Sequence, residues 1–231
     1  MTMESEIDEW NQAIEARINS SENRNLVIVL RIAGILTILG AGYIIQDIVK
    51  DAARRNSTKN RIMLVMSSCD LLNAFVNSLL GPVMVPKGIG VPGAMGNQLT
   101  CDVQGFLVYV SGAASGLYNV SLALCYLLIV RYEYSDKKLY KLYLPMIVCL
   151  VIAISGLHFG IYNFTGYNAC FINSSPLDCD TPESPIECER GDLYMYWRYL
   201  CSIMMIIRVC VIIFCMVKMY TAVLNRERSG D

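Results

Sequence analysis

Charged residues are scarce in this chain. Of its 231 residues, only 17% are charged and 55% are hydrophobic, whereas about a quarter of the residues in a soluble domain are charged. This surplus of apolar residues is too large for one soluble core, and it fits a chain whose solvent is lipid. The net charge of −1 offers no basic footprint, so we expect no nucleic-acid partner.

Histidine is nearly absent, and familiar enzyme motifs are missing. The single histidine, His158, argues against a zinc site or a histidine-based catalytic triad. The sequence contains no nucleotide-binding glycine loop, no GxSxG and no HExxH. Residues 135–138 match SxxK, but the partner motifs of that signature are lacking. We therefore expect no enzymatic activity and no cofactor.

Five apolar segments of 21 to 28 residues are present instead. A bilayer core needs ~20 helical residues to cross, so each segment is long enough to span. The first follows a polar, mostly acidic stretch and is longer than the ~7–15-residue apolar region of a signal peptide, so it is a permanent helix. We expect an all-α membrane protein, a five-helix transmembrane bundle with spans at 26–49, 62–85, 103–130, 142–162 and 193–217.

Lysine and arginine are distributed unevenly between the stretches that flank these spans. Twelve of the 19 lie in a set that we call the basic loops, residues 50–61, 131–141 and 218–231. Four lie in a set that we call the acidic loops, residues 1–25, 86–102 and 163–192. Cytoplasmic loops carry the excess of these residues. We therefore expect an integral plasma-membrane protein with an extracellular N-terminal tail, an extracellular loop at 163–192 and a cytosolic C-terminal tail.

Cysteines and glycosylation sequons agree with this orientation. Four of the ten cysteines lie in the acidic loops, namely Cys101, Cys170, Cys179 and Cys188. An extracellular setting is oxidising, so we expect disulfides, and the residues alone leave three pairings open. The other six lie within the spans and are read as small buried residues. We expect glycosylation at the outer sequons of Asn19 and Asn173, whereas Asn56 is cytosolic.

Three polar residues are expected near the middle of the membrane. Asp70 lies nine residues from Arg61 at the cytosolic face, or about 13 Å deep at ~1.5 Å per residue. Ser121 lies ten residues from Arg131 and reaches a similar depth, with Asn119 slightly further out. These residues predict a small polar cluster that holds water or an ion. The alternative is a protonated Asp70 that only ties two helices together.

Arg208 is a second intramembrane charge. It lies ten residues from Lys218, too deep to reach either interface easily. It needs an acidic or carbonyl partner. Asp70 is the only acid of this chain at that depth, and a neighbour outside the chain is an equal alternative.

Glycine pairs mark expected helix contacts. "GAASG" at 112–116 and "GLHFG" at 156–160 have the Gly-xxx-Gly spacing that lets helix backbones approach. We expect ordinary helix packing at both places rather than a specific dimer.

Several strings resemble a known family. The second span contains "MSSCDLLNAF", Cys101 heads the third, and the third ends in "LLIVRYEY". With an outside N-terminus, these features are similar to those of seven-helix G-protein-coupled receptors. The strings "GAMGNQLTCDVQGFLV", "LYNVSLALCYLLIVRY" and "CERGD" resemble a set of receptor-like proteins of diatoms, distantly similar to rhodopsin-like and slime-mould cyclic-AMP receptors. The resemblance covers about residues 26–220 and implies helices 1–5 of the seven-helix receptor fold.

The resemblance also implies roles for individual residues. Arg131, followed by Tyr132, would be the arginine of the D/E-R-Y activation motif at the cytosolic end of helix three. Asp70 would be the acid of helix two that binds sodium and water. Cys101 would pair with Cys170, which leaves Cys179 with Cys188, and Cys101–Cys188 is the competing pair.

The chain departs from the family pattern in three ways. Val130 replaces the acid that precedes the arginine, and Cys101 lies thirty residues before Arg131, so the third helix must tilt or project beyond a ~30 Å core. The chain also ends at Asp231, just after the fifth span. Three explanations are open: a fragment or truncated form of a receptor, a natural short form that dimerises with full-length receptors, or a five-span protein with another task.

The expected function is a membrane receptor that passes a signal from an extracellular ligand to a heterotrimeric G protein. One alternative is a channel or transporter whose polar path would include Asp70, Asn119 and Arg208. A second is an adhesion or scaffold protein that uses the loop at 163–192. Fold alone does not decide between them.

Overall fold

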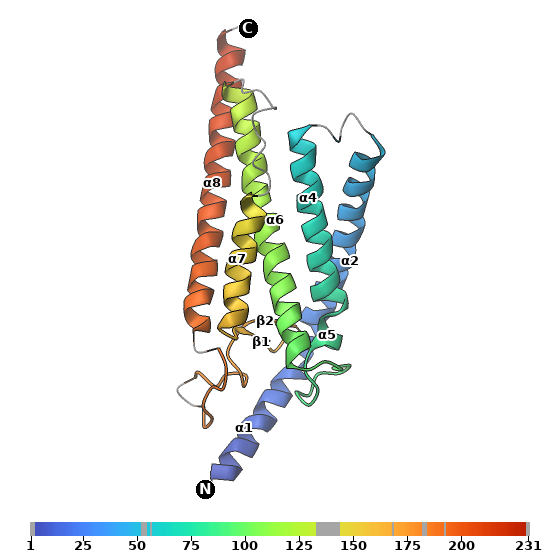
Figure 1. Ribbon diagram of the computed structural model, residues 1–231, viewed down its shortest axis with the longest axis vertical. Helices are drawn as coiled ribbons and strands as arrows, with labels where there is room; N and C mark the ends of the chain where they lie inside the picture. The colour runs from blue at the N-terminus through green and yellow to red at the C-terminus, as the bar shows by residue number, and fades with distance from the viewer. Residues whose placement is uncertain are drawn as a thin grey trace.

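The computed structural model describes residues 3–51, 55, 57–132, 144–167, 169–181, 184–191 and 193–229. Most of these residues are helical, and the long helices run side by side (Figure 1). The elements in chain order are α1 (Met3–Ile18), α2 (Ser21–Lys50), α4 (Thr58–Ala74), the π-helix η1 (Phe75–Leu79), α5 (Gly81–Met84), α6 (Gln98–Tyr132), α7 (Leu144–His158), β1 (Tyr162–Phe164), β2 (Cys170–Ile172) and α8 (Tyr194–Ser229).

Four helical segments of the described chain are long and apolar enough to cross a membrane. They are α2, α4 continued by η1, α6, and most of α8. Only 6% of the most apolar stretch of α8 and 11% of that of α2 is buried inside the molecule. Helices with apolar surfaces on nearly all sides are stable when lipid replaces water around them. The prediction of an all-α membrane bundle is confirmed.

The fourth apolar helix is shorter than expected. Over the described residues, α7 contains 15 residues, or about 22 Å, whereas the bilayer core is ~30 Å thick. Gly160, two residues beyond its end, has a φ of +60°, a conformation that terminates helices and favours glycine. The chain then enters β1 at Tyr162. The expected helix at 142–162 therefore ends at His158, and residues 142 and 143 lie outside the described part.

The second span is interrupted near its end, where the sequence predicted one helix over 62–85. In η1 the backbone widens, and the N–H of Leu80 donates to the carbonyl of Phe75 (3.0 Å), five residues back. A Cβ at Gly34 of α2 would lie 2.3 Å from the Cβ of Ser78. The glycine thus lets α2 approach the widened turn closely.

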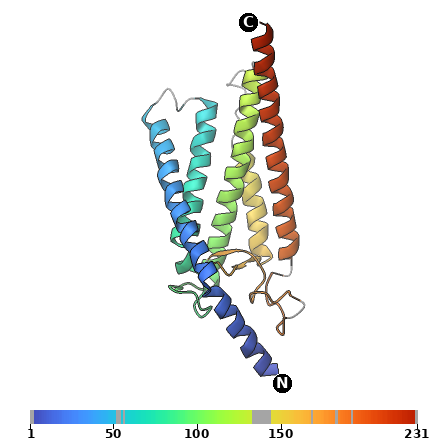
Figure 2. The same cartoon turned by 180° about the vertical axis from the view of Figure 1, so that it is seen from behind.

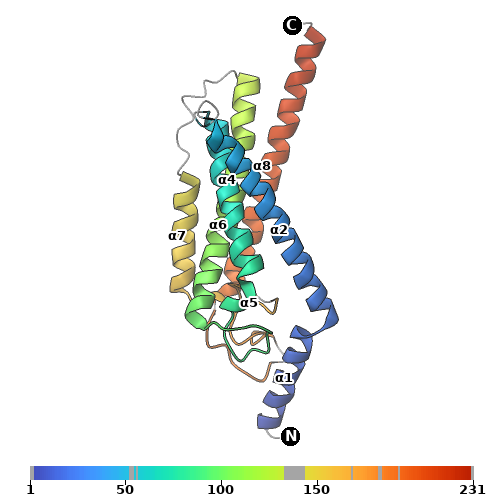
Figure 3. The same ribbon diagram turned by 90° about the vertical axis from the view of Figure 1, so that its right-hand side faces the viewer.

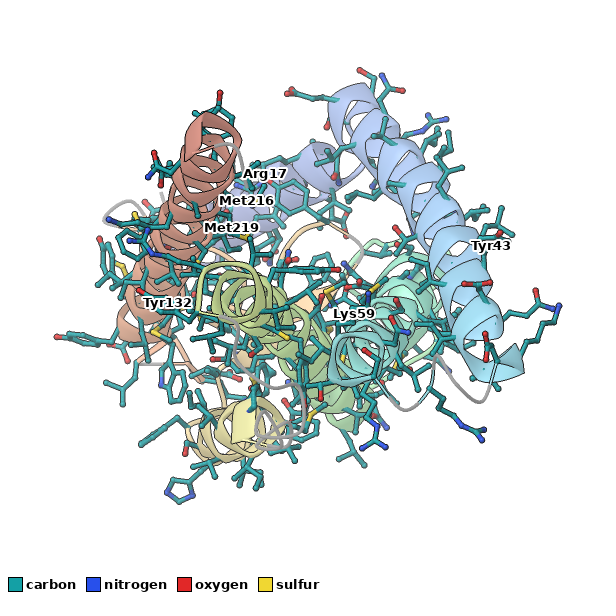
Figure 4. All side chains as sticks on the ribbon, turned by 90° about the horizontal axis from the view of Figure 1, so that it is seen from above. Arg17, Tyr43, Lys59, Tyr132, Met216 and Met219 are labelled. Carbon is teal, nitrogen blue, oxygen red and sulfur yellow. A yellow bond between two sulfur atoms is a disulfide. The ribbon has the colours of Figure 1, made fainter. Side chains whose placement is uncertain are left out.

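Helix α6 lies at the centre of the bundle. Viewed from above, it is surrounded by α4, α7 and α8, and α2 lies outside α4 (Figure 4). Buried side chains along α6, including Ala114, Tyr118 and Cys125, form the core together with Cys69 of α4 and Cys149 of α7. The remaining surface of α2 and α8 is apolar and exposed, as expected for helices that face lipid.

The expected N-terminal tail contains a helix, α1. Helix α1 lies at an angle beyond the end of the bundle (Figures 2 and 3). Ile14 and Ile18 of α1 pack against Phe164 and Leu177, and Arg17 forms an ion pair with Asp178 (2.5 Å). These contacts attach α1 to the hairpin region.

The two sets of loops lie at opposite ends of the bundle. Helix α1, the hairpin β1–β2 and α5 share one end, and the C-terminus of α8 lies at the other (Figure 1). The ends of α2 and α6 that lead into the basic loops are also on the C-terminal side. This separation agrees with the grouping of loops by charge, and the cellular orientation stays a prediction.

Candidate functional site

A disulfide and a buried glutamine hold the hairpin against α6. Cys101 of α6 is bonded to Cys170 of β2, and both are fully buried. One turn further along α6, the side-chain carbonyl of Gln104 accepts a hydrogen bond from the Cys170 N–H (3.1 Å). The amide of the same glutamine donates to the carbonyl of Val76 in η1 (3.4 Å). Helix α6, strand β2 and η1 are therefore fixed to one another.

Strand β1 packs directly on the backbone of α6. A Cβ at Gly105 would lie 2.7 Å from the Cβ of Tyr162, so this close approach requires glycine. The hydroxyl of Tyr162 donates to the carbonyl of Ala153 in α7 (3.1 Å). The tyrosine thus joins the hairpin to two helices of the bundle.

The rest of the loop before α8 is tied down by a second disulfide and by an ion pair. Cys179 is bonded to Cys188, and Arg190 donates to Asp102 of α6 (2.9 Å). The two disulfide pairings are the ones that the family resemblance implied. Both disulfides involve the segment that covers the end of the bundle next to α1.

A cavity of about 460 Å³, which we call the bundle cavity, lies between α6, α7, α8 and β2. This volume falls in the range of ~300–1,000 Å³ that is usual for small-molecule sites. Its apolar wall includes Leu117, Val148, Ile152, Phe171, Met204 and Met205. Its polar groups include Asn73, Tyr109, Ser202, Arg198 and Arg208. The cavity therefore combines a mostly apolar surface with a few polar groups, as ligand sites do.

A second cavity, the hinge cavity, has a volume of about 570 Å³ and lies where α1 meets α2. Asn23 borders it and donates to the carbonyls of Ile18 (2.7 Å) and Gly166 (3.1 Å). Phe171 and Arg198 border both cavities. Strand β2 thus lies between the hinge cavity and the bundle cavity.

Arg208 lies in the wall of the bundle cavity and points at α6. Its Nε donates to the carbonyl of Met204 on its own helix (3.1 Å), and Nη1 lies 3.5 Å from the carbonyl of Ala113 on α6. A Cβ at Gly116 would lie 2.2 Å from that Nη1. The glycine of "GAASG" therefore makes room for a guanidinium, whereas the sequence predicted close helix backbones there. We expected an acidic or a carbonyl partner for Arg208, and in the structure its partners are backbone carbonyls.

Asp70 faces a different side of α6. The hydroxyl of Ser115 donates to its carboxylate (2.5 Å). The two other predicted members of the polar cluster lie apart from this bond: Ser121 donates to the carbonyl of Leu117 on its own helix (2.9 Å), and Asn119 is exposed. The structure thus pairs Asp70 with Ser115, and an ion or water site at Asp70 stays a proposal.

Arg131 and Tyr132 lie at the C-terminal end of α6, and both are exposed. The guanidinium carbon of Arg131 lies 5.7 Å from the centre of the Tyr132 ring, within cation–π range. Residues 133–141, which complete this basic loop, lie outside the described residues. The arginine therefore lies at the end of α6 that leads into this basic loop, 14 residues beyond Leu117 of the cavity wall.

The two predicted glycosylation sites differ in their surroundings. Asn19 lies in the exposed turn between α1 and α2, where its amide donates to the carbonyl of Glu15 (3.1 Å). The amide of Asn173 is partly buried and donates to the carbonyl of Phe164 within the hairpin (2.9 Å). Because Asn19 is exposed whereas Asn173 is half-buried against the hairpin, Asn19 is the better acceptor.

The intramembrane cysteines are mostly buried, as expected. Cys69, Cys125, Cys149 and Cys215 are buried and Cys201 is half-buried, whereas Cys210 on the outer surface of α8 is exposed.

The sequence interpretation missed several residues that shape the site. Gln104, Ser115 and Tyr109 were given no role, although Gln104 follows Cys101 by three positions and so lies on the same helix face. That three-residue spacing was the one sequence feature that pointed to Gln104. Tyr109 stacks on Phe171 of β2 with ring centres 6.4 Å apart, a contact that no local pattern predicts.

Comparisons with known proteins identify the fold. No protein-family model and no curated protein matches the chain. Among solved structures, the crystal structure of squid rhodopsin is similar, with a TM-score of 0.67 and 17% sequence identity. The match covers 90% of this chain and 55% of the squid rhodopsin chain. The chain therefore has a fold like that of squid rhodopsin and spans about half of its length.

Proposed function

We propose that this protein is a receptor-type membrane protein that binds a ligand in the bundle cavity and passes the signal to a heterotrimeric G protein. The observation that carries the proposal is a cavity beneath a disulfide-tied hairpin within a fold like that of squid rhodopsin. The cavity borders residues 108–117 of α6, and Arg131 lies 14 residues beyond Leu117, or ~21 Å along the same helix, so α6 would connect the two places. Ligand and G protein would favour the same global state of the bundle.

The proposed orientation puts the hairpin and α1 outside the cell. It is supported by the excess of lysine and arginine in the basic loops, and by the two disulfides at the other end. In this orientation, the ligand reaches the cavity from outside or from the bilayer. Arg131 and Tyr132 then face the cytosol, where a G protein would bind. Asp70, bonded to Ser115, is the proposed site of sodium or water between α4 and α6.

The experiment that tests this function is ligand-dependent G-protein activation by the longest chain that the transcript encodes, expressed in cells. The substitution Arg131→Ala should abolish this activation but leave membrane insertion and orientation intact, because 11 other basic residues remain in the basic loops. Nucleotide exchange measures activation, and protease protection measures orientation.

A matched control is Arg31→Ala, which removes an arginine of α2 far from the cytosolic end of α6. This variant should signal normally. Absence of activation by every extracellular extract or ligand tested on the wild-type chain would contradict the proposed function. If the Arg131→Ala variant inserts in the inverted orientation, Arg131 acts mainly as a signal for membrane topology.

A further inference from the structure

The bundle cavity carries an unbalanced positive charge. Its described lining contains two arginines, Arg198 and Arg208, and no aspartate or glutamate. The nearby acid, Asp70, is bonded to Ser115, whereas Arg208 meets α6 at Ala113 and Gly116. Asp70 and Arg208 therefore contact adjacent residues of α6, Ser115 and Gly116, and do not pair with each other.

The guanidinium of Arg208 is incompletely satisfied by the protein. It has five N–H donors, and the structure gives it one bond of 3.1 Å to a carbonyl of its own helix and one long contact of 3.5 Å to α6. Both acceptors are neutral. Arg208 lies ten residues from Lys218, or ~15 Å along the helix, near the middle of a bilayer. A cation at this depth is expensive unless an anion accompanies it.

The remainder of the cavity is suited to an aliphatic chain. Leu117, Val148, Ile152 and Met205 line it, and Gly116 leaves the guanidinium room beside them. Three apolar side chains of the cavity lining, Val148, Leu200 and Met205, are also exposed on the surface of the bundle, so lipid borders the cavity. An apolar molecule with one anionic group would therefore match both the wall and the charge.

We propose that the bundle cavity binds a long-chain carboxylate from the bilayer, with its carboxylate on Arg208 and its chain along the apolar wall. A carboxylate matches the planar fork of a guanidinium and adds a single charge at this depth. A phosphate group carries up to about two negative charges, more than the single positive charge of Arg208 could balance at this depth. This inference rests on the proposed function in placing the ligand in the bundle cavity, and it names the ligand class.

Binding of oleate to the purified protein in nanodiscs tests this inference. A photoreactive oleate analogue should label residues of the cavity, and unlabelled oleate should compete. Arg208→Gln should weaken binding about ten- to a hundredfold, the effect of losing one charge-assisted pair. Arg208→Lys, which keeps the charge, should retain part of the affinity. Arg31→Gln, which changes an arginine of α2 outside the cavity, should bind normally.

Gly116→Ala is an independent test that keeps the charge. The added methyl would meet the flexible end of Arg208 at 2.2 Å from Nη1, so the guanidinium must shift while the helices stay in place. This variant should also bind oleate more weakly, and a normal Cys101–Cys170 disulfide would show that it is folded.

Two ligand controls separate head group from chain. Oleyl alcohol has the same chain without the charge, and octanoate has the charge on a short, water-soluble chain. Both should compete poorly with oleate. Equal competition by oleyl alcohol, equal competition by octanoate, or unchanged binding by Arg208→Gln would each overturn the inference.

The inference and the proposed function fail separately. Oleate binding without G-protein activation by any ligand would support the inferred ligand class and contradict the proposed receptor function. G-protein activation by another ligand, with no oleate binding, would support the receptor function and contradict the inferred ligand class.

Discussion

At the scale of residues, α6 keeps two intramembrane charges apart. Asp70 bonds to Ser115, and Arg208 lies against Gly116, the next residue of the same helix. Consecutive helical positions differ in direction by about 100°, so the two charges approach different sides of α6. The two opposite charges thus contact different residues of the protein rather than each other.

This separation predicts that substitutions at the two charges act independently. Asp70→Ala and Arg208→Gln share no hydrogen-bond partner, so their coupling energy should lie at the low end of the ~0.5–3 kcal/mol that is typical of neighbouring residues. The measurement is a double-mutant cycle of denaturant unfolding in detergent. A direct ion pair would instead give a coupling energy of several kcal/mol, since removing one member of a buried pair costs about 3–5 kcal/mol.

At the scale of elements, glycines fix where helices end and where the hairpin docks. Gly160 ends α7 through its positive φ, and the chain turns into β1 two residues later. Gly105 then receives β1 on the backbone of α6. The disulfide between Cys101 and Cys170 holds β2 at the same place. The cover of the bundle cavity depends on this short stretch of α6.

Gly105→Ala should therefore displace the hairpin. The added methyl would lie 2.7 Å from Cβ of Tyr162, which is part of the strand rather than a flexible tip. Overpacking of this kind costs about 1–3 kcal/mol, measured as a lower unfolding temperature and as easier reduction of the Cys101–Cys170 bond.

The matched control for this prediction is Gly40→Ala on α2, where a Cβ would meet no atom within 4 Å. It should be neutral or stabilising by up to about 1 kcal/mol, because alanine favours helix. Equal behaviour of the two variants would contradict the proposed docking of β1 on α6.

At the scale of the whole molecule, the helical spans were predictable and the contacts between them were not. Hydropathy and length identify helices such as α6 and α8, because lipid imposes both. They report the depth of Arg208 but not its direction. That direction depends on how α8 and α6 are rotated about their axes. Depth alone suggested Ser121 as a neighbour of Asp70, whereas rotation and tilt place Ser115 there.

Long-range contacts explain the other differences. Helix α1 is polar enough to be read as a tail. The four-residue spacing of Ile14 and Ile18 is a weak helical signal, and the residues that cover them, Phe164 and Leu177, are far along the chain. The early end of α7 at His158 depends on a hairpin whose strand pairing cannot be predicted from hydropathy. The sequence therefore predicts the helical spans better than it predicts α1 and the hairpin that lie at their end.

The orientation of the whole molecule predicts which sequon carries a glycan. Asn19 is exposed between α1 and α2 at the disulfide-bearing end, so it should be glycosylated when the protein is made in a eukaryotic membrane. Asn173 should stay largely bare, because its side chain is half-buried against the hairpin. Asn19→Gln should remove the mobility shift that a glycosidase removes, whereas Asn173→Gln should leave it. Asn56→Gln is the control from a basic loop, and a glycan lost with Asn56 instead of Asn19 would place the basic loops outside and contradict the orientation.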